Sequence, residues 1–224
     1  MVPSGNKKKI SESTIHRLSL YFRVLDLLER QGHQTVSSKE LARKEKLTPA
    51  QVRKDLSFFG SFGTRGLGYP VGQLKMRIAE ILGINKMWKV ALIGVGNIGS
   101  ALVGYKEFQR QGFDISLIFD NDQRKIGSNH KGIIVSDIKN LEKELRENDI
   151  QIVIIAVPST VAQYLVDDIV KAGIKGILNF APIHLKVPSD IFLRNENMSM
   201  ELEYISFALN NLRNAQQSDN PSKL

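Results

Sequence analysis

A glycine motif that directly follows a short apolar run constrains the fold of this 224-residue chain more than any other feature. The run Lys89–Ile93 (KVALI) predicts a buried strand, and the next six residues have the pattern G-x-G-x-x-G. Between a strand and a helix, this pattern allows a tight turn, close approach of a pyrophosphate to the backbone and close helix–strand packing. We therefore expect a dinucleotide-binding loop formed by Gly94, Val95, Gly96, Asn97, Ile98 and Gly99.

Strands and helices alternate through the rest of this half of the chain. This alternation is typical of right-handed βαβ units that build a parallel sheet. We therefore expect an α/β fold, with a Rossmann-like domain over residues 85–197. Strands are predicted at Ile115–Phe119, Ile133–Val135, Ile150–Val157 and Gly176–Phe180, and helices at Ser100–Arg110, Leu141–Glu147 and Val161–Ala172.

Asp120 ends the second predicted strand, 21 residues after Gly99. A carboxylate at this place binds the ribose hydroxyls of a dinucleotide and repels the 2′-phosphate of NADP(H). Arg124 and Lys125 lie nearby in the sequence and weaken that preference slightly. The motif and the acid together favour NADH or NAD⁺ as the ligand. A glycine-rich turn in an α/β domain without a ligand is the alternative.

The positive charge of the chain is concentrated in its first part. Residues 1–88 contain 16 Lys and Arg against 7 Asp and Glu, whereas residues 89–224 contain 15 against 16. Such asymmetry indicates that one part meets a polyanion. Nucleic acid is the leading candidate and an anionic membrane surface the second. A solvated basic face without a partner is the remaining alternative.

The basic part has the order helix, capped helix, capped helix and glycine-rich ribbon. Ser11–Arg30 carries an apolar stripe at helical spacing, and the capping box in Ser37–Glu40 opens a second helix. The stretch Thr48–Gln51 starts a third helix. It has a capping threonine, a proline at the first helical position and a glutamine that can reach back to the cap. Residues 60–72 (GSFGTRGLGYPVG) suggest a tight two-stranded ribbon. This order predicts a winged helix-turn-helix domain over residues 1–84, with a small helical dimerisation module as the alternative.

One face of the third helix is short-chained, polar and cationic. At 100° per residue, Arg53, Lys54 and Ser57 point away from the apolar side of the helix. A DNA major groove admits one helix, whose exposed face must reach phosphates and base edges. An arginine at the tip of the ribbon can enter a minor groove. The residues expected to contact DNA are Thr48, Gln51, Arg53, Lys54, Ser57, Thr64, Arg65 and Gly66.

Missing residue types and patterns exclude several classes of function. The chain has no cysteine, which excludes disulfides, thiolate metal sites and thiol redox switches. Its four histidines show no paired metal-ligand spacing. No apolar run of about 18 residues predicts a membrane span, and no secretory signal is evident. We therefore expect no metal, no membrane partner and a cytoplasmic location.

Candidate catalytic residues are scarce. A hydride-transfer enzyme needs an acid or base aimed at its substrate, and only about 100 residues follow Asp120 to complete the sheet. His130 and His184 are the candidates, and neither has an evident carboxylate partner nearby in the sequence. We expect no enzyme activity and keep two alternatives, an NAD-dependent oxidoreductase and a CoA-binding domain protein. Asp120 argues against the second, because the ribose 3′-hydroxyl of CoA is phosphorylated.

Three stretches of the chain resemble the Rex family of redox-sensing transcriptional repressors. They are residues 36–69 (VSSKELARKEKLTPAQVRKDLSFFGSFGTRGLGY), 91–102 (ALIGVGNIGSAL) and 173–182 (GIKGILNFAP), and the resemblance covers about residues 11–212. It implies a homodimer that binds an inverted-repeat operator in DNA as a repressor and is released by NADH. It also implies that NAD⁺ competes at the same site and favours the DNA-bound form.

The resemblance assigns further residues to the cofactor cleft. Tyr105 matches a tyrosine near the nicotinamide that helps the conformational switch. Pro158, Asn179 and Phe180 match segments that line the cleft. These four roles are implied by the resemblance alone.

The resemblance also describes the C-terminal part of the chain. Residues 198–213 are similar to a dimerisation helix that is swapped between subunits and lies between the two domains of the partner. The polar residues 214–224 are expected to form a disordered tail. Arg23 matches an arginine that pairs across the dimer with an acid near this helix. This chain has Asn197 at that place, and its neighbour Glu196 is the alternative partner.

Overall fold

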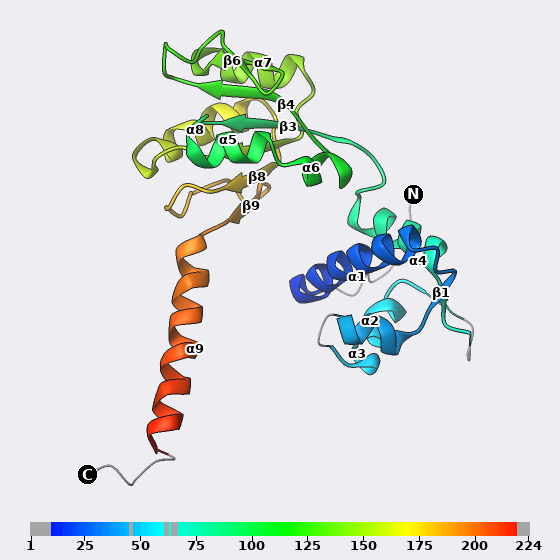
Figure 1. Ribbon diagram of the computed structural model, residues 1–224. Helices are drawn as coiled ribbons and strands as arrows, with labels where there is room; N and C mark the ends of the chain where they lie inside the picture. The colour runs from blue at the N-terminus through cyan, green and yellow to red at the C-terminus, as the bar shows by residue number, and fades with distance from the viewer. Residues whose placement is uncertain (1–9, 45–46, 61–62, 64–66, 219–224) are drawn as a thin grey trace. The chain divides into compact units, whose positions relative to one another are not determined.

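The chain divides into two compact units, an N-terminal unit, Met1–Lys86, and a C-terminal unit, Met87–Leu224 (Figure 1). The structure is a computed structural model that describes residues 10–44, 47–60, 63 and 67–218. Each unit has its own apolar core. The two units are therefore described separately.

Helices build the N-terminal unit around one core. Leu18, Tyr21 and Leu25 of the first helix are fully buried, as are Val52 of the third helix and Ile78 of the fourth. The apolar stripe predicted for the first helix therefore faces this core. The helices are α1 (Glu12–Arg30), α2 (Ser38–Lys44), α3 (Pro49–Ser57) and α4 (Val71–Leu82).

Side-chain caps fix the starts of α2 and α3. The Ser37 hydroxyl accepts the Glu40 amide at 3.1 Å, and the Glu40 carboxylate accepts the Ser37 amide at 2.7 Å, which confirms the capping box. The Thr48 hydroxyl accepts the Gln51 amide at 3.1 Å, which confirms the start of α3. The Gln51 side chain differs from the prediction, because its amide donates to Asp55 instead of reaching back to the cap.

Only part of the predicted ribbon lies among the described residues. Strand β2 (Tyr69–Pro70) pairs antiparallel with β1 (Thr35–Val36), a partner before α2 that the prediction did not include. Gly68 makes this approach possible, since a Cβ there would lie 2.6 Å from the Val36 carbonyl oxygen and its φ is +83°. Within residues 60–72, Gly63 lies against Gly68, since a Cβ at Gly63 would be 2.8 Å from the Gly68 carbonyl oxygen, and the two-stranded pairing itself stays a prediction. The predicted tip, residues 64–66, lies outside the described residues.

A seven-stranded sheet forms the centre of the C-terminal unit. Its strands, in spatial order, are β5 (Asn129–His130), β6 (Ile133–Asp137), β4 (Phe113–Asp120), β3 (Trp88–Ile93), β7 (Ile152–Ile155), β8 (Gly176–Asn179) and β9 (Phe192–Asn195). All neighbouring pairs are parallel except β5 with β6. This confirms the predicted parallel sheet. The chain order reverses at β3, and in open α/β sheets ligands bind at such a switch point.

Short helices cover the two faces of this sheet. On one face, α7 (Leu141–Glu147) and α8 (Ser159–Lys171) pack against the larger apolar cluster. On the other face lie α5 (Asn97–Val103) and α6 (Lys106–Arg110), whose side chains pack against the smaller cluster. The single helix predicted over Ser100–Arg110 is wrong, because α5 ends at Val103, with Gly104 as its C-cap, and Tyr105 is the N-cap of a new helix.

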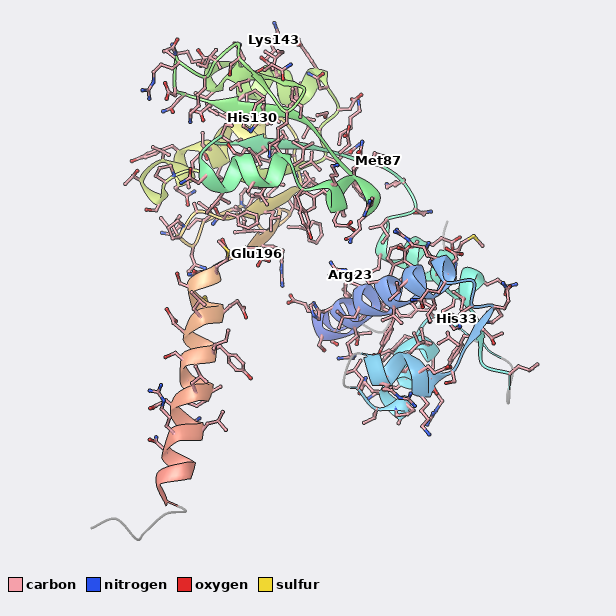
Figure 2. All side chains as sticks on the ribbon, viewed as in Figure 1. Arg23, His33, Met87, His130, Lys143 and Glu196 are labelled. Carbon is pink, nitrogen blue, oxygen red and sulfur yellow. The ribbon has the colours of Figure 1, made fainter. Side chains whose placement is uncertain are left out.

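The last helix, α9 (Met198–Ser218), is longer than predicted. Residues 214–218 belong to it, which corrects their prediction as disordered tail, and residues 219–224 lie outside the described part of the chain. Every described residue from 198 to 214 is exposed. Figure 2 shows side chains projecting around this helix, with Glu196 just ahead of its first turn.

Candidate functional site

Helix α3 has a buried side and an exposed polar side. Val52, Asp55 and Leu56 are buried, whereas Arg53 and Lys54 are exposed. Ala50 and Ser57 are exposed as well. Two cations and two small residues therefore form the accessible face, as the helical spacing predicts.

Most residues predicted to contact DNA make only local contacts within the N-terminal unit. Arg53 Nη1 donates to the Ser38 hydroxyl at 3.2 Å, so the guanidinium spans from α3 to the start of α2. The Ser57 hydroxyl donates to the Lys54 carbonyl at 2.7 Å. Thr48 and Gln51 lie in the first turn of α3, where Thr48 caps and Gln51 bonds Asp55. Thr64, Arg65 and Gly66 lie outside the described residues.

The glycine loop between β3 and α5 packs backbone against backbone. A Cβ at Gly94 would lie 2.5 Å from the Ala156 carbonyl oxygen, and its φ is +97°. A Cβ at Gly99 would lie 1.9 Å from the Gly94 carbonyl oxygen. Gly96 is the N-cap of α5, is exposed and has nothing within 4 Å of its Cβ position. Gly94 and Gly99 thus permit the turn, and Gly96 leaves an open approach to the helix N-terminus.

Asp120 lies at the carboxyl end of β4, beside this loop, and is 7% exposed. One carboxylate oxygen accepts the Val95 amide at 2.8 Å and Lys125 Nζ at 2.9 Å, and the other accepts the Asp122 amide at 2.9 Å. Burial raises the pKa of this carboxyl, but the hydrogen bonds and the Lys125 charge outweigh it, so the pKa lies below its ordinary value. Asp120 is therefore ionised and held against the loop before any ligand arrives.

A cleft of about 470 Å³ joins the loop to Asp120. Of the predicted cofactor residues, Gly94, Gly96, Asp120 and Pro158 line it. The first turns of α8 supply the apolar Val161 and Leu165 to its wall. The sequence analysis did not single out these lining residues: Asn121, Asp122, Ile138, Ala156, Val157, Val161 and Leu165. The signal for five of them was their position directly after strands, where parallel sheets place ligands, whereas Val161 and Leu165 lie in α8.

The other predicted cofactor residues lie outside the lining of this cleft. Val95 and Gly99 are buried within the loop, and Asn97 and Ile98 are exposed in the first turn of α5. Tyr105 is 54% exposed between α5 and α6, with its ring edge-on to Phe108 at a centroid distance of 5.1 Å. Their cofactor contacts stay predictions.

Asn179 is fully buried, and its side chain is engaged within the protein. The amide nitrogen donates to the carbonyl oxygens of Ala181 and Ile183 and to Asn195 Oδ1, and Asn179 Oδ1 accepts the Ala181 amide. Phe180 packs against the apolar cluster under α5 and α6. Neither residue belongs to the lining of the cleft described above, and their cofactor contacts stay predictions.

The groups considered for catalysis do not form a catalytic pair among the described residues. His184 is exposed in the loop after β8, and the buried Nε2 of His130 has no hydrogen-bond partner in the described part of the chain. The described residues contain no cluster of three or more His, Asp and Glu side chains suited to hold a metal ion. None of their helices combines the length and apolar character needed to cross a membrane.

Two family models match the chain on either side of the boundary between its units. A model described as a putative DNA-binding protein N-terminus matches residues 9–57, and a model described as a CoA binding domain matches residues 85–183. These matches coincide with the helix-turn-helix and with the sheet that carries the glycine loop. A cationic helix-turn-helix joined to a dinucleotide-type fold defines a ligand-responsive transcription regulator.

Curated relatives cover nearly the whole chain. A redox-sensing transcriptional repressor Rex from Desulforamulus reducens is 47% identical over 90% of this chain and 96% of the relative. A protein of the same name from Desulfitobacterium hafniense is 48% identical over 89% of this chain and 95% of the relative. The chain therefore belongs to the Rex family of redox-sensing transcriptional repressors.

Solved structures of one repressor share the whole fold. RSP, a Rex-family repressor, is 37% identical and covers 95% of this chain and 99% of its own, with a TM-score of 0.86. RSP in complex with β-NAD⁺ and operator DNA gives a TM-score of 0.88, and RSP in complex with β-NADH gives 0.84. The winged helix-turn-helix and the Rossmann-like sheet of the present chain are thus those of this family.

Proposed function

We propose that this chain represses transcription as a homodimer bound to operator DNA and leaves the operator when NADH occupies the cleft of the C-terminal unit. This proposal rests on one observation: the same chain has an exposed cationic recognition helix and a cleft lined by Gly94, Gly96 and Asp120. The names of its relatives support a regulator rather than an enzyme. It acts in the cytoplasm, where operator DNA and the dinucleotide pool meet.

The N-terminal unit supplies the contacts to DNA. Arg53, Lys54 and Ser57 enter the major groove, where the cations reach phosphates and base edges and the small Ser57 allows close approach. The amide groups at the start of α3, next to Thr48, donate to a backbone phosphate. Arg65, with Thr64 and Gly66, reaches the minor groove. RSP in complex with operator DNA supports this assignment of the unit.

The C-terminal unit supplies the dinucleotide site. The pyrophosphate lies at the N-terminus of α5, where Gly96 leaves the backbone accessible and the helix dipole stabilises negative charge. The Asp120 carboxylate accepts hydroxyls of the adenosine ribose. Val161 and Leu165 give apolar contact to the adenine, and Pro158 lines the entrance toward the nicotinamide. The chemistry of these groups fits NADH and NAD⁺.

The C-terminal helix provides the dimer contact. Met198, Leu202, Ile205, Leu209 and Leu212 follow each other at spacings of three and four residues on one side of α9, and all are more than half exposed. Met200, Tyr204 and Phe207 form a second apolar stripe on the opposite side, equally exposed. A helix that is apolar on opposite sides is stable in water only when it is covered from both.

A second copy of this chain is the proposed cover for these two stripes. The resemblance to the Rex family supports a position of the helix between the two domains of the partner, which would offer two surfaces at once. The C-terminal unit also carries an apolar groove of about 310 Å³ on the α6 face of the sheet, lined by residues such as Phe108, Ile115, Ile154, Leu178 and Phe192. A twofold dimer presents two equivalent recognition helices, so its operator is an inverted repeat.

Binding of NADH must favour a dimer conformation that does not fit the operator. Shifting a two-state equilibrium from 1:99 to 99:1 takes about 5.5 kcal/mol of differential affinity. Tyr105, at the break between α5 and α6, is the proposed residue near the nicotinamide that carries this change. Asn197 caps α9, since its Oδ1 accepts the Ser199 amide at 3.0 Å. We therefore assign Glu196, one residue earlier, as the acid that pairs with Arg23 across the dimer.

Fluorescence anisotropy tests the proposal. The protein is titrated into a labelled AT-rich inverted-repeat duplex, and then NADH or NAD⁺ is added. We expect tight binding that NADH abolishes and NAD⁺ does not. Binding that responds to salt alone would refute the sensor function, and turnover of NADH with a small carbonyl substrate would favour an oxidoreductase.

The variant Arg53→Ala tests, in the same assay, whether operator binding and NADH binding belong to different units. It is expected to lose operator binding and to keep the NADH affinity of the parent, because Arg53 lies on α3, outside the unit that holds the cleft. Operator binding at the parent level would show that the recognition face is assigned wrongly. NADH binding is followed by its own fluorescence, which gives a readout independent of DNA.

A further inference from the structure

A buried acid lies in the last turn of the recognition helix. Asp55 follows Arg53 and Lys54 directly, yet its side chain is 1% exposed, whereas both neighbours are exposed. Sequence analysis gave Asp55 no role. A carboxylate within the helix that must approach phosphates weakens binding unless it is turned away and neutralised.

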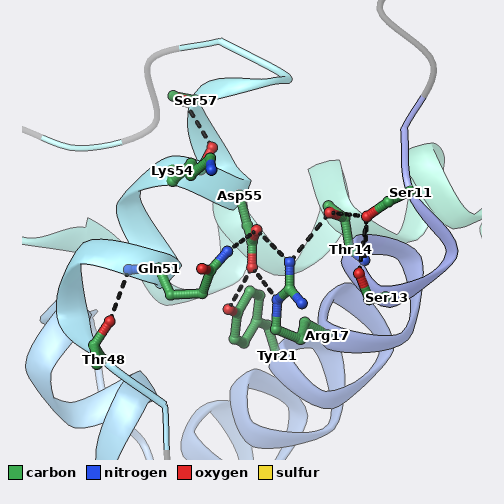
Figure 3. A network of polar contacts seen from close by, with 10 residues as sticks. All are labelled: Ser11, Ser13, Thr14, Arg17, Tyr21, Thr48, Gln51, Lys54, Asp55 and Ser57. Atoms are coloured by element: carbon green, nitrogen blue, oxygen red, sulfur yellow. Dashed lines mark hydrogen bonds and ion pairs between the residues drawn. The ribbon is translucent and has the colours of Figure 1, made fainter.

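Four donors saturate this carboxylate, and three of them come from α1 (Figure 3). Arg17 Nε donates to Oδ2 at 2.6 Å and Arg17 Nη2 to Oδ1 at 2.8 Å, which is a bidentate ion pair. The Tyr21 hydroxyl donates to Oδ2 at 2.8 Å, and Gln51 Nε2 donates to Oδ1 at 2.7 Å. Each oxygen therefore accepts two hydrogen bonds, which is the full capacity of a carboxylate. We call Asp55, Arg17, Tyr21 and Gln51 the Asp55 cluster.

The cluster continues to the first turn of α1. Arg17 Nη2 also donates to the Thr14 hydroxyl at 3.2 Å, and that hydroxyl lies 2.9 Å from the hydroxyl of Ser11, the N-cap of α1. Arg17 is 18% exposed, so water screens the pair only slightly. Hydrogen bonds thus connect the start of α1 to the last turn of α3 without interruption.

The apolar contacts of α3 with the core set its rotation about its own axis only approximately. Val52 and Leu56 pack among apolar side chains, and such contacts are non-directional. A bidentate ion pair has a defined geometry and allows only a narrow range of orientations. The Asp55 cluster is the directional contact between α1 and the buried side of α3.

We propose that Asp55 is a positioning residue for operator recognition, which holds the rotation of α3 through Arg17 and Tyr21 so that the cationic face meets the groove. Asp55 does not contact DNA itself. Gln51, predicted to contact DNA, belongs instead to this positioning cluster. The inference rests on the proposed operator binding, and it adds a residue that acts through the orientation of others.

The variant Asp55→Asn tests the proposal, because a positioning role and simple electrostatics predict opposite changes in operator affinity. Its net charge is one unit more positive, so simple electrostatics predicts tighter binding to any DNA. A positioning role predicts the opposite for the operator, a loss of about tenfold or more, because a hydrogen-bonded charge pair is broken. Binding to a random duplex of equal length is expected to stay unchanged or to rise. Operator affinity equal to or above that of the parent overturns the proposal.

Two further variants keep the test decisive. Tyr21→Phe retains the buried ring and removes one donor, so it folds even where Asp55→Asn does not, and we expect it to weaken operator binding several-fold. Parent-level operator affinity of Tyr21→Phe would count against the proposal in the same way. Asp26→Asn is the matched control, since it removes an acid of α1 whose partners are Lys75 and Arg30, outside the cluster. It is expected not to weaken operator binding.

Operator binding by the parent protein shows which of the two proposals, the positioning role or the proposed function, a negative result would overturn. Absence of operator binding by the parent would overturn the repressor function itself. Operator binding by the parent together with parent-level operator affinity of either Asp55→Asn or Tyr21→Phe would overturn the positioning role alone. NADH affinity is measured on every variant, and it is expected to equal that of the parent because the cluster lies in the N-terminal unit.

Discussion

Two alanine substitutions in the glycine loop are expected to have opposite consequences. Gly96→Ala should leave the folded protein intact and impair dinucleotide binding, because nothing lies within 4 Å of its Cβ position. Its φ of −84° and ψ of −163° are accessible to alanine. Alanine as an N-cap destabilises the folded protein by about 0.5–1 kcal/mol relative to glycine. Alanine also lowers the conformational entropy of the unfolded chain, which stabilises the folded protein by about 0.4–1 kcal/mol. The net change in unfolding free energy is therefore close to zero.

The same methyl group stands where the pyrophosphate must approach. A phosphate pushed away from the α5 N-terminus loses one or two charge-assisted hydrogen bonds, each worth about 1.5–3 kcal/mol. This corresponds to a loss of at least about tenfold in NADH affinity. Fluorescence titration with NADH measures the affinity, and thermal unfolding without ligand measures the stability. A folded Gly96→Ala protein with the parent affinity for NADH would refute the placement of the pyrophosphate.

Gly99→Ala is the matched comparison within the same loop. Its Cβ would lie 1.9 Å from the Gly94 carbonyl oxygen, so strand and helix must separate by about 1.1 Å to restore a 3.0 Å contact. Overpacking of this kind costs about 1–3 kcal/mol, and a rigid backbone neighbour puts it at the upper end. We expect a lower melting temperature together with weaker NADH binding. An unchanged melting temperature would contradict the close packing described for this loop.

Three further substitutions test other parts of the molecule. Asp120→Arg should shift cofactor preference from NADH toward NADPH, because it replaces the group that repels a 2′-phosphate, and parallel titrations with both would show it. Leu209→Glu should convert the proposed dimer to monomer and weaken operator binding in sedimentation and anisotropy experiments, whereas Asn210→Glu, between the two stripes of α9, should change neither. The pKa of Asp55 is raised by burial but lowered more by its hydrogen bonds from Arg17, Tyr21 and Gln51. Its stabilisation is therefore full above about pH 4, the unfolded pKa, and is lost as the pH falls through the lower folded pKa. The stability gap between the parent and Asp55→Asn in chemical denaturation should be largest near neutral pH and shrink below about pH 4.

Features with a local physical cause were predictable from the sequence. Thr48 and Pro49 determine the start of α3 through a cap and a fixed φ, both within one turn. The glycine loop was predictable because each glycine has a steric reason that depends only on its neighbours in the βα unit. Asp120 follows from the same unit, since β4 is the next strand and ends beside the loop.

Features that depend on distant partners were not predictable in the same way. Arg17 and Asp55 are 38 residues apart, and each looks like an ordinary surface charge in its own helix. Strand β2 finds its partner β1 before α2, because Val36 is buried there and Gly68 permits the contact. Asn179 fitted a cleft-lining segment by resemblance, but its amide is satisfied by groups as distant as Asn195. Tertiary packing, not local pattern, decides such contacts.

The state of Asp120 before ligand binding has a consequence for what the protein reports. Its carboxylate is already ionised and oriented by the amides of Val95 and Asp122 and by Lys125. Dinucleotide binding therefore takes up and releases no proton at this group around neutral pH. When the pH around the protein varies near neutrality, this contact of the cleft therefore contributes the same free energy to dinucleotide binding. The proposed contact of Asp120 with the adenosine ribose is thus the same for NADH and NAD⁺, and it adds no response to acidity of its own.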